Sequence, residues 1–209
     1  MSELFMRYNK LEACRCDIEA AIDVLKKAYY LGGKLLVCGN GGSCADSEHI
    51  VGELMKGFML KRRVGDTFKK KLYDLGFEDA AYIAENLQGA LPAIALPSQS
   101  AVISAFANDV TADMAYAQLV YGYGAENDVF MGISTSGNSK NIVLAAKVAK
   151  AKGLKTIALT GEKNSRLSEI CDVTLRVPET ETFKVQEMHL PVYHYICEEL
   201  EKEFFERSK

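Results

Sequence analysis

The chain has 209 residues, enough for one domain with a sizeable core, and its 48% hydrophobic and 25% charged residues are typical of a folded globular protein. A net charge of -3 excludes a global basic field, so we expect no nucleic-acid partner. Neither a disulfide scaffold nor an apolar run of about 18 residues is present, which predicts a cytoplasmic protein with reduced thiols and no membrane span.

Apolar residues recur every three or four positions from Leu11 to Tyr30, which predicts a long N-terminal helix that ends at two glycines. The continuous apolar run KLLVCGN at 34–40 predicts a buried parallel strand. Ser43 is then placed to cap the helix that follows.

The same pattern repeats along the rest of the chain. Further strands are predicted at 91–98, 128–137, 154–161 and 171–179, with a helix at 139–152 and a long C-terminal helix at 183–206. Strands that alternate with helices indicate a single α/β domain over 1–209, in which helices cover both faces of a parallel sheet. Ligands bind such sheets beyond the carboxyl ends of the strands, so we expect a site at 38–43, 134–139 and 159–162.

The segment STSGNS carries hydroxyl side chains immediately after a predicted strand. Free N–H groups at the next helix start could join these hydroxyls on a phosphate group. The alternative is a serine-rich turn in which one serine, Ser139, caps the helix. No lysine occupies the position that nucleotide hydrolysis requires. The hydroxyl residues are Ser134, Thr135, Ser136 and Ser139.

Glycines at 39–42 do not match the dinucleotide fingerprint, but they allow a small ligand to approach the backbone closely, beside the amide of Asn40. In the helix that follows, His49 and Glu53 are four residues apart and share one face. This spacing suits a metal site or an acid/base pair, although such a pair often only stabilises a helix.

Gln186 and His194 lie eight positions apart in the C-terminal helix, about 12 Å along its axis. They could hold one ion only if Gln186 sits at a bent helix start or if the two come from different subunits. Pro191 would kink the helix, which favours the first arrangement.

Four motifs in this order resemble the sugar isomerase (SIS) family, and within it the phosphoheptose isomerases. They are GNGGSCADSEHIVGEL, the ND of Asn108 and Asp109, GISTSGNSKNIVLAAKVAKAKGLKTIALTG and VQEMHLPVYH. The resemblance implies a three-layer α-β-α domain with a five-stranded, flavodoxin-like parallel sheet and long terminal helices. It also implies a homotetramer whose sites are shared between subunits, and conversion of sedoheptulose 7-phosphate to D-glycero-D-manno-heptose 7-phosphate.

The same resemblance implies site residues. One zinc ion per subunit is expected on the positions matching His49, Glu53, Gln186 and His194. Substrate contacts are expected from Asn40, Gly41, Gly42, Glu53, Asn108, Asp109, Ser134, Thr135, Ser136, Ser139 and Gln186. Interconversion of a ketose and an aldose moves a proton between adjacent carbons through an enediol, and we assign Glu53 as the base and His194 as its partner. The zinc ion could be catalytic, structural or inhibitory.

Two alternatives to this function stay open: a non-catalytic SIS protein that binds a phosphosugar or a replication initiator, and an isomerase of another sugar phosphate. The chain also departs from the family pattern. Lys56 stands where an arginine is common, so Lys61, Arg62 or Arg63 could replace that cation. An insertion at about 66–89, helical near 78–87, is either a cap or subunit contact, or a surface elaboration.

Overall fold

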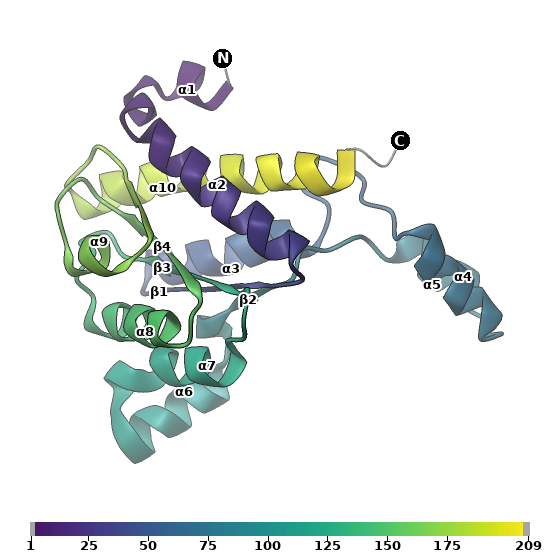
Figure 1. Ribbon diagram of the computed structural model, residues 1–209. Coiled ribbons are helices and arrows are strands. Elements are labelled where there is room, and N and C mark those ends of the chain that lie inside the picture. Colours follow the sequence, from purple (N-terminus) through teal and green to yellow (C-terminus); the bar gives the residue numbers. More distant parts are fainter. Residues whose placement is uncertain (1–2, 207–209) are drawn as a thin grey trace.

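Five parallel strands form one sheet in the computed structural model, which describes residues 3–206. The order is β2-β1-β3-β4-β5, which confirms the expected flavodoxin-like sheet (Figure 1). The strands are β1 Leu35–Gly39, β2 Ala93–Ala95, β3 Val129–Ile133, β4 Lys155–Thr160 and β5 Val173–Arg176. Residues 1–2 and 207–209 of the predicted domain lie outside the described residues.

Each predicted apolar run contains one strand, but the strands are shorter than the runs. The run at 91–98 keeps only three residues in β2, because the chain enters a 3-10 turn at Leu96–Ser98. Pro97 lies in that turn and has no N–H to offer a sheet ladder.

Helices cover both faces of the sheet (Figure 1). One layer contains α2, α3 and α10, and the other contains α7, α8 and α9. Neighbouring strand residues alternate between the two cores, since Leu35 and Val37 pack in the first and Leu36 and Cys38 in the second. Burial on both faces explains why the strands are continuously apolar.

The described helices have the following bounds: α1 Glu3–Arg7, α2 Arg15–Tyr30, α3 Gly42–Met55, α4 Asp66–Asp74, α5 Ala80–Asn86, α6 Ser100–Phe106, α7 Ala115–Tyr123, α8 Lys140–Ala151, α9 Arg166–Ile170 and α10 Thr182–Glu201. The predicted N-terminal helix begins with a 3-10 turn at Asn9–Cys14, and the predicted C-terminal helix ends in a π turn at Lys202–Glu206. No helix of this described set is long and apolar enough to cross a membrane.

The predicted cap at Ser43 is wrong. Helix α3 begins at Gly42, so its N-cap position is Gly41, two residues before Ser43, and no side chain caps it. Ser43 is buried inside the first turn, where it packs so closely on β1 that a Cβ at Gly39 would lie 2.6 Å from the Ser43 Cβ. Its place is therefore set by packing against the strand end.

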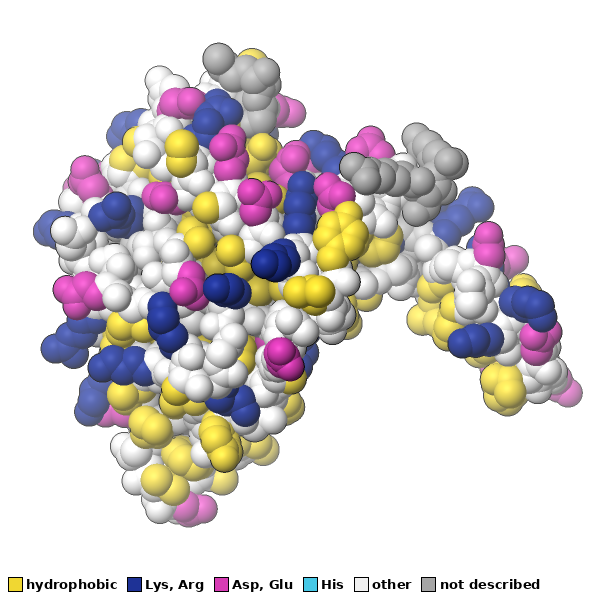
Figure 2. All heavy atoms as spheres, in the orientation of Figure 1, with side chains coloured by type: hydrophobic (Ala, Val, Ile, Leu, Met, Phe, Trp, Pro, Cys, Tyr) yellow, Lys and Arg dark blue, Asp and Glu magenta, His cyan; other side chains and the backbone are white. Residues whose placement is uncertain are grey.

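The insertion forms a helical hairpin, α4 and α5, that projects from the body of the molecule (Figures 1 and 2). Helix α5 confirms the predicted helix near 78–87, whereas α4 was not predicted. Leu72, Ala80 and Ala84 form a small separate cluster within the hairpin. An antiparallel bridge between Arg63 and Gln88 joins the two ends of the hairpin to each other.

Candidate functional site

The site begins where the strand order reverses, at the carboxyl ends of β1 and β3. The two strands are paired from Leu35 with Val129 to Gly39 with Ile133, so the loops that follow them leave the sheet side by side. Asn40 and Asn141 exchange two amide hydrogen bonds of 2.9 Å, which tie the loop after β1 to the first turn of α8.

Gly41 and Gly42 have different structural roles at the start of α3. Gly41 has φ +56°, a conformation that other residues rarely adopt. The side chain of Gln186 packs directly on Gly42. A Cβ at this position would lie only 2.7 Å from Gln186 Nε2, so a larger residue would clash there. Gln186 thus packs on the first turn of α3.

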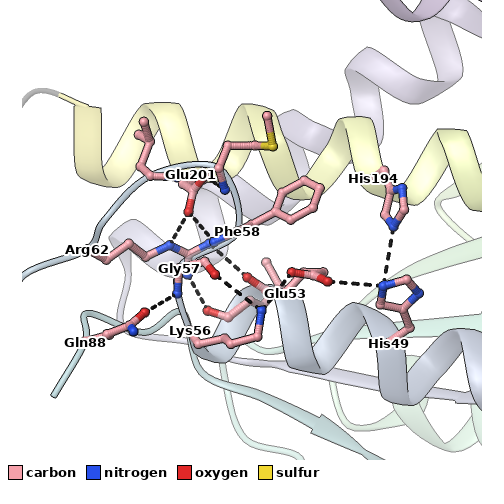
Figure 3. Close-up of polar contacts among 12 residues, drawn as sticks. His49, Glu53, Lys56, Gly57, Phe58, Arg62, Gln88, His194 and Glu201 are labelled. Atoms are coloured by element: carbon pink, nitrogen blue, oxygen red, sulfur yellow. Dashed lines mark hydrogen bonds and ion pairs between the residues drawn. The ribbon is translucent and has the colours of Figure 1, made fainter. Parts of the chain in front are cut away.

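Helices α3 and α10 bring two histidines and a glutamate together (Figure 3). His49 Nε2 lies 3.1 Å from Glu53 Oε1 and 3.5 Å from His194 Nε2. Asp46, His49 and Glu53 follow one another at spacings of three and four residues, so they form one stripe of α3 that faces α10. The ring of Phe58 packs on His194 with 5.4 Å between centroids.

Lys56 forms an ion pair with the same glutamate, Glu53. Its Nζ lies 3.2 Å from Glu53 Oε2, and the Glu53 side chain is only 13% exposed. Each carboxylate oxygen of Glu53 therefore has a partner in this chain, one an imidazole and the other an ammonium group.

The pKa of His194 is lowered mainly by burial and further by the neighbouring His49, while the charge of Glu53 opposes this shift. A lowered pKa favours the neutral imidazole at neutral pH. Neutral imidazole can both donate and accept a proton at its ring nitrogens.

Three of the expected zinc ligands, His49, Glu53 and His194, lie close together. Imidazole and carboxylate groups are typical zinc ligands, and neighbouring ligands of a tetrahedral zinc ion with bonds of about 2.0–2.1 Å are about 3.3 Å apart. The separations from His49 Nε2 match that value. As they stand, however, the residues at 3–206 contain no group of three or more His, Cys, Asp or Glu side chains that could hold a metal ion. The donor chemistry therefore fits zinc, and zinc binding stays a prediction.

Gln186 lies apart from this trio, on Gly42. Helix α10 runs from Thr182 to Glu201 and passes through Pro191 without ending. Both Gln186 and His194 nevertheless contact α3 of the same chain, seven residues apart along that helix.

The serine-rich loop after β3 is held by its own hydroxyl groups. Ser134 Oγ and Ser139 Oγ are 3.0 Å apart, and Ser136 Oγ accepts a hydrogen bond of 3.2 Å from the Asn138 N–H. Ser139 precedes α8 but does not cap it through its side chain, so the alternative role of a helix cap is not observed. A cavity of about 210 Å³ beside this loop is lined by Thr135, Ser136, Asn138, Gly161, Glu162, Lys163, Asn164, Glu179 and Thr180.

Asn108 and Asp109 lie elsewhere in the chain. They are exposed in the π turn Ala107–Thr111, where Asn108 Nδ2 donates to Asp109 Oδ1 at 2.8 Å. This turn continues α6 and contacts the 3-10 turn Ala112–Met114, which packs on α7 and α8, across the sheet from α3 and α10. Within one chain, the structure does not bring this pair to the histidines.

Tyr193 and Asp46, which lie beside the site, were not predicted from the sequence. The Tyr193 hydroxyl lies 3.0 Å from His49 Nδ1 and 3.3 Å from Asp46 Oδ1. Arg62, a proposed replacement cation, is instead buried, and it donates to Glu201 and to the Leu54 carbonyl. No local pattern indicates these contacts, since the partners of Tyr193 are more than 140 residues away in the sequence.

Comparison with known proteins identifies the family of this chain. A model of the SIS domain matches residues 89–194. The phosphoheptose isomerase of Citrifermentans bemidjiense is 38% identical over 92% of this chain and 86% of its own, and that of Clostridium acetobutylicum is 38% identical over 90% and 83%. The chain belongs to the phosphoheptose isomerase group of the SIS family.

Solved structures support the same membership. A phosphoheptose isomerase from Francisella tularensis superposes with a TM-score of 0.77 at 29% identity, covering 94% of this chain and 91% of that one. The enzyme from Neisseria gonorrhoeae gives 0.75 at 27%, covering 96% and 94%. The chain is thus placed among isomerase enzymes, and the relatives span the α3 residues that the SIS model does not reach.

Proposed function

We propose that this isomerase interconverts sedoheptulose 7-phosphate and D-glycero-D-manno-heptose 7-phosphate. The observation that carries the proposal is the meeting of Glu53 and His194, from two helices, around His49 Nε2. A protein that only bound a phosphosugar would need neither a base nor a proton donor at this place. The names of the similar proteins give the substrate class.

Glu53 acts as the base in this proposal. Its carboxylate takes a proton from C1 of the ketose while the C2 carbonyl oxygen gains one, which produces the enediol. The same group then returns a proton to C2, and the O1 hydroxyl loses its proton to form the aldehyde. His194 exchanges the oxygen protons, a role that suits a neutral imidazole. Lys56 Nζ donates a hydrogen bond of 3.2 Å to Glu53 Oε2, the other oxygen of the base.

The serine-rich loop anchors the phosphate group in this scheme. Ser134 and Ser139 offer hydroxyls at the N-terminus of α8, and Gly137, with φ +65°, lets the loop close tightly. Binding energy gained at the phosphate then holds the reacting carbons over Glu53. Asn40 stands between the two parts of the site and contacts the sugar.

A zinc ion on His49, Glu53 and His194, with Gln186 as a further ligand, belongs to the proposal. When bound, zinc would polarise the substrate carbonyl and stabilise negative charge on the enediolate oxygens. Glu53 then has two roles, as ligand and as base. The Nε2 atoms of His49 and His194 are 3.5 Å apart, so both could bind the same ion.

A homotetramer with shared sites is also part of the proposal. Support comes from Asn108 and Asp109, which are exposed on the far layer of their own chain. The surrounding segment Ser100–Met114 has no buried residue in the described chain, so its surface is open to another subunit.

The test is to incubate the purified protein with sedoheptulose 7-phosphate and follow aldose formation by NMR, before and after removal of metal with a chelator. We expect turnover that falls on chelation and returns with added zinc. Turnover that chelation leaves unchanged would remove zinc from the proposal. No turnover in either condition, with zinc restored, would overturn the isomerase function itself.

A further inference from the structure

Tyr193 connects a carboxylate to a site histidine. Its side chain is almost fully buried at 2% exposure, and its hydroxyl lies between Asp46 Oδ1 at 3.3 Å and His49 Nδ1 at 3.0 Å. Its ring packs edge-on against both His49 and His194. The hydroxyl therefore touches the side of His49 that faces away from Glu53.

A tyrosine hydroxyl has one proton to donate. A carboxylate can only accept, so the proton of Tyr193 goes to Asp46, whose other oxygen is buried without a partner among the described residues. The lone pairs of the tyrosine oxygen are then left for His49, and Nδ1 must carry a hydrogen to use them. The carboxylate of Asp46 therefore sets the direction of both hydrogen bonds, the one from Tyr193 and the one to it.

We propose that Tyr193 is a positioning residue that, through Asp46, fixes His49 in the tautomer with the proton on Nδ1. His49 Nε2 then presents a lone pair to Glu53 Oε1 and His194 Nε2. Hydrogen bonds to the outer nitrogen are how proteins orient metal-binding and proton-transferring histidines. Two acceptor atoms, His49 Nε2 and Glu53 Oε1, then face each other at 3.1 Å, and a cation or a shared proton between them would stabilise the pair.

This inference deepens the proposed function, because it concerns the same site, but its test does not depend on turnover. The chain has three histidines, so their ring nitrogens can be followed by 15N NMR of the full-length, metal-free protein in alkaline buffer, where imidazoles are neutral. For the wild-type protein we expect His49 with Nδ1 protonated and Nε2 bare.

Two variants test the direction of these two hydrogen bonds. In Asp46→Ala, the Tyr193 hydroxyl has only His49 Nδ1 as an acceptor, so the proton of His49 should move to Nε2. In Tyr193→Phe, Nδ1 loses its partner and the Nε2–H form should again increase. Tyr195→Phe is the matched control, since this ring packs on Phe5 instead, and it should leave the His49 signals unchanged.

Zinc affinity gives a second readout. Loss of an outer hydrogen bond of this kind lowers metal affinity about 10- to 100-fold, so Tyr193→Phe should weaken zinc binding in a chelator competition while Tyr195→Phe should not. The proposal is overturned if wild-type His49 carries its proton on Nε2, or if both Asp46→Ala and Tyr193→Phe keep it on Nδ1. Absence of zinc binding in the wild type would remove the metal from the proposed function and leave the tautomer result standing.

Discussion

His189 differs from the two site histidines because it is fully buried on α10. Its Nε2 lies 3.4 Å from the Thr160 carbonyl oxygen, and its Nδ1 has no partner among the described residues. Burial lowers the pKa of His189 to about 4, and the contact with Thr160 only partly opposes the shift. The folded protein therefore keeps this ring neutral where an unfolded chain would protonate it.

This shift predicts a loss of stability in mild acid. Between about pH 6.5 and 4 the unfolded chain binds a proton that the folded chain does not, so the free energy of unfolding is full above pH 6.5 and falls as the pH drops. The loss reaches about 3 kcal/mol for a shift of this size. Urea unfolding across this pH range should show it, and His189→Asn should flatten the slope. Equal slopes in the two proteins would contradict the assignment.

Sequence reasoning at the scale of residues succeeded where neighbours are close along a helix. The spacing of His49 and Glu53 predicts that they share a face, and they are in contact. The partners of Tyr193 and Gln186 could not be predicted, because those contacts depend on how α10 packs on α3. A capping serine was predicted at Ser43 from a local preference that packing against β1 overrides.

At the scale of elements, the loop between α3 and the helical hairpin is fixed by one buried ion pair (Figure 3). Arg62 Nε donates to Glu201 at 2.7 Å, and both side chains are almost fully buried. Glu201 also accepts from the backbone N–H groups of Phe58, Met59 and Leu60. Burial raises the pKa of Glu201, but the hydrogen bonds from Phe58 and Arg62 lower it more.

Glu201→Gln should therefore be strongly destabilising. Removal of one partner leaves Arg62 buried without a countercharge, which costs about 3–5 kcal/mol. Glu199→Gln is a suitable control, because Glu199 pairs with the half-exposed Lys202 and such pairs contribute at most about 1 kcal/mol. Denaturant unfolding of the two variants would refute this role if it gave similar losses.

The hairpin of α4 and α5 is expected to be independent of the core. Its buried cluster is separate, and the bridge between Arg63 and Gln88 holds its ends close together. Replacement of residues 66–87 by a short Gly-Ser linker should shift the melting temperature by less than about 4 °C, the change that ~1 kcal/mol produces in a chain of this size. Loss of cooperative unfolding in that variant would show instead that the hairpin supports the fold.

The hairpin of α4 and α5 could be predicted only in part from the sequence. Helix α5 was predicted from its pattern, but α4 was hidden in a basic run that is typical of a solvated face. Where the hairpin points could not be predicted, because few contacts with the body specify its direction. The hydrogen bond from Gly57 N–H to Gln88 places the base of the hairpin beside the C-terminal end of α3.

At the scale of the whole molecule, the fold assembles the site from distant parts of the chain. The sequence predicted five strands from continuous apolar runs, but their order came only from the family resemblance, since apolar runs do not specify neighbours. The strand order reverses between β1 and β3, and this brings the glycine turn and the serine-rich loop together at the carboxyl ends of the two strands. Figure 2 shows basic and acidic side chains interspersed over the visible face.

The most direct test of the account is proton transfer by Glu53 in the whole enzyme. Turnover of sedoheptulose 7-phosphate should be compared in Glu53→Gln and in Glu48→Gln, a change on the same helix at an exposed residue that accepts a hydrogen bond from Ser98. We predict that Glu53→Gln lowers kcat at least about 10²- to 10⁴-fold while substrate binding persists, and that Glu48→Gln is near normal. Normal turnover in Glu53→Gln would contradict the account.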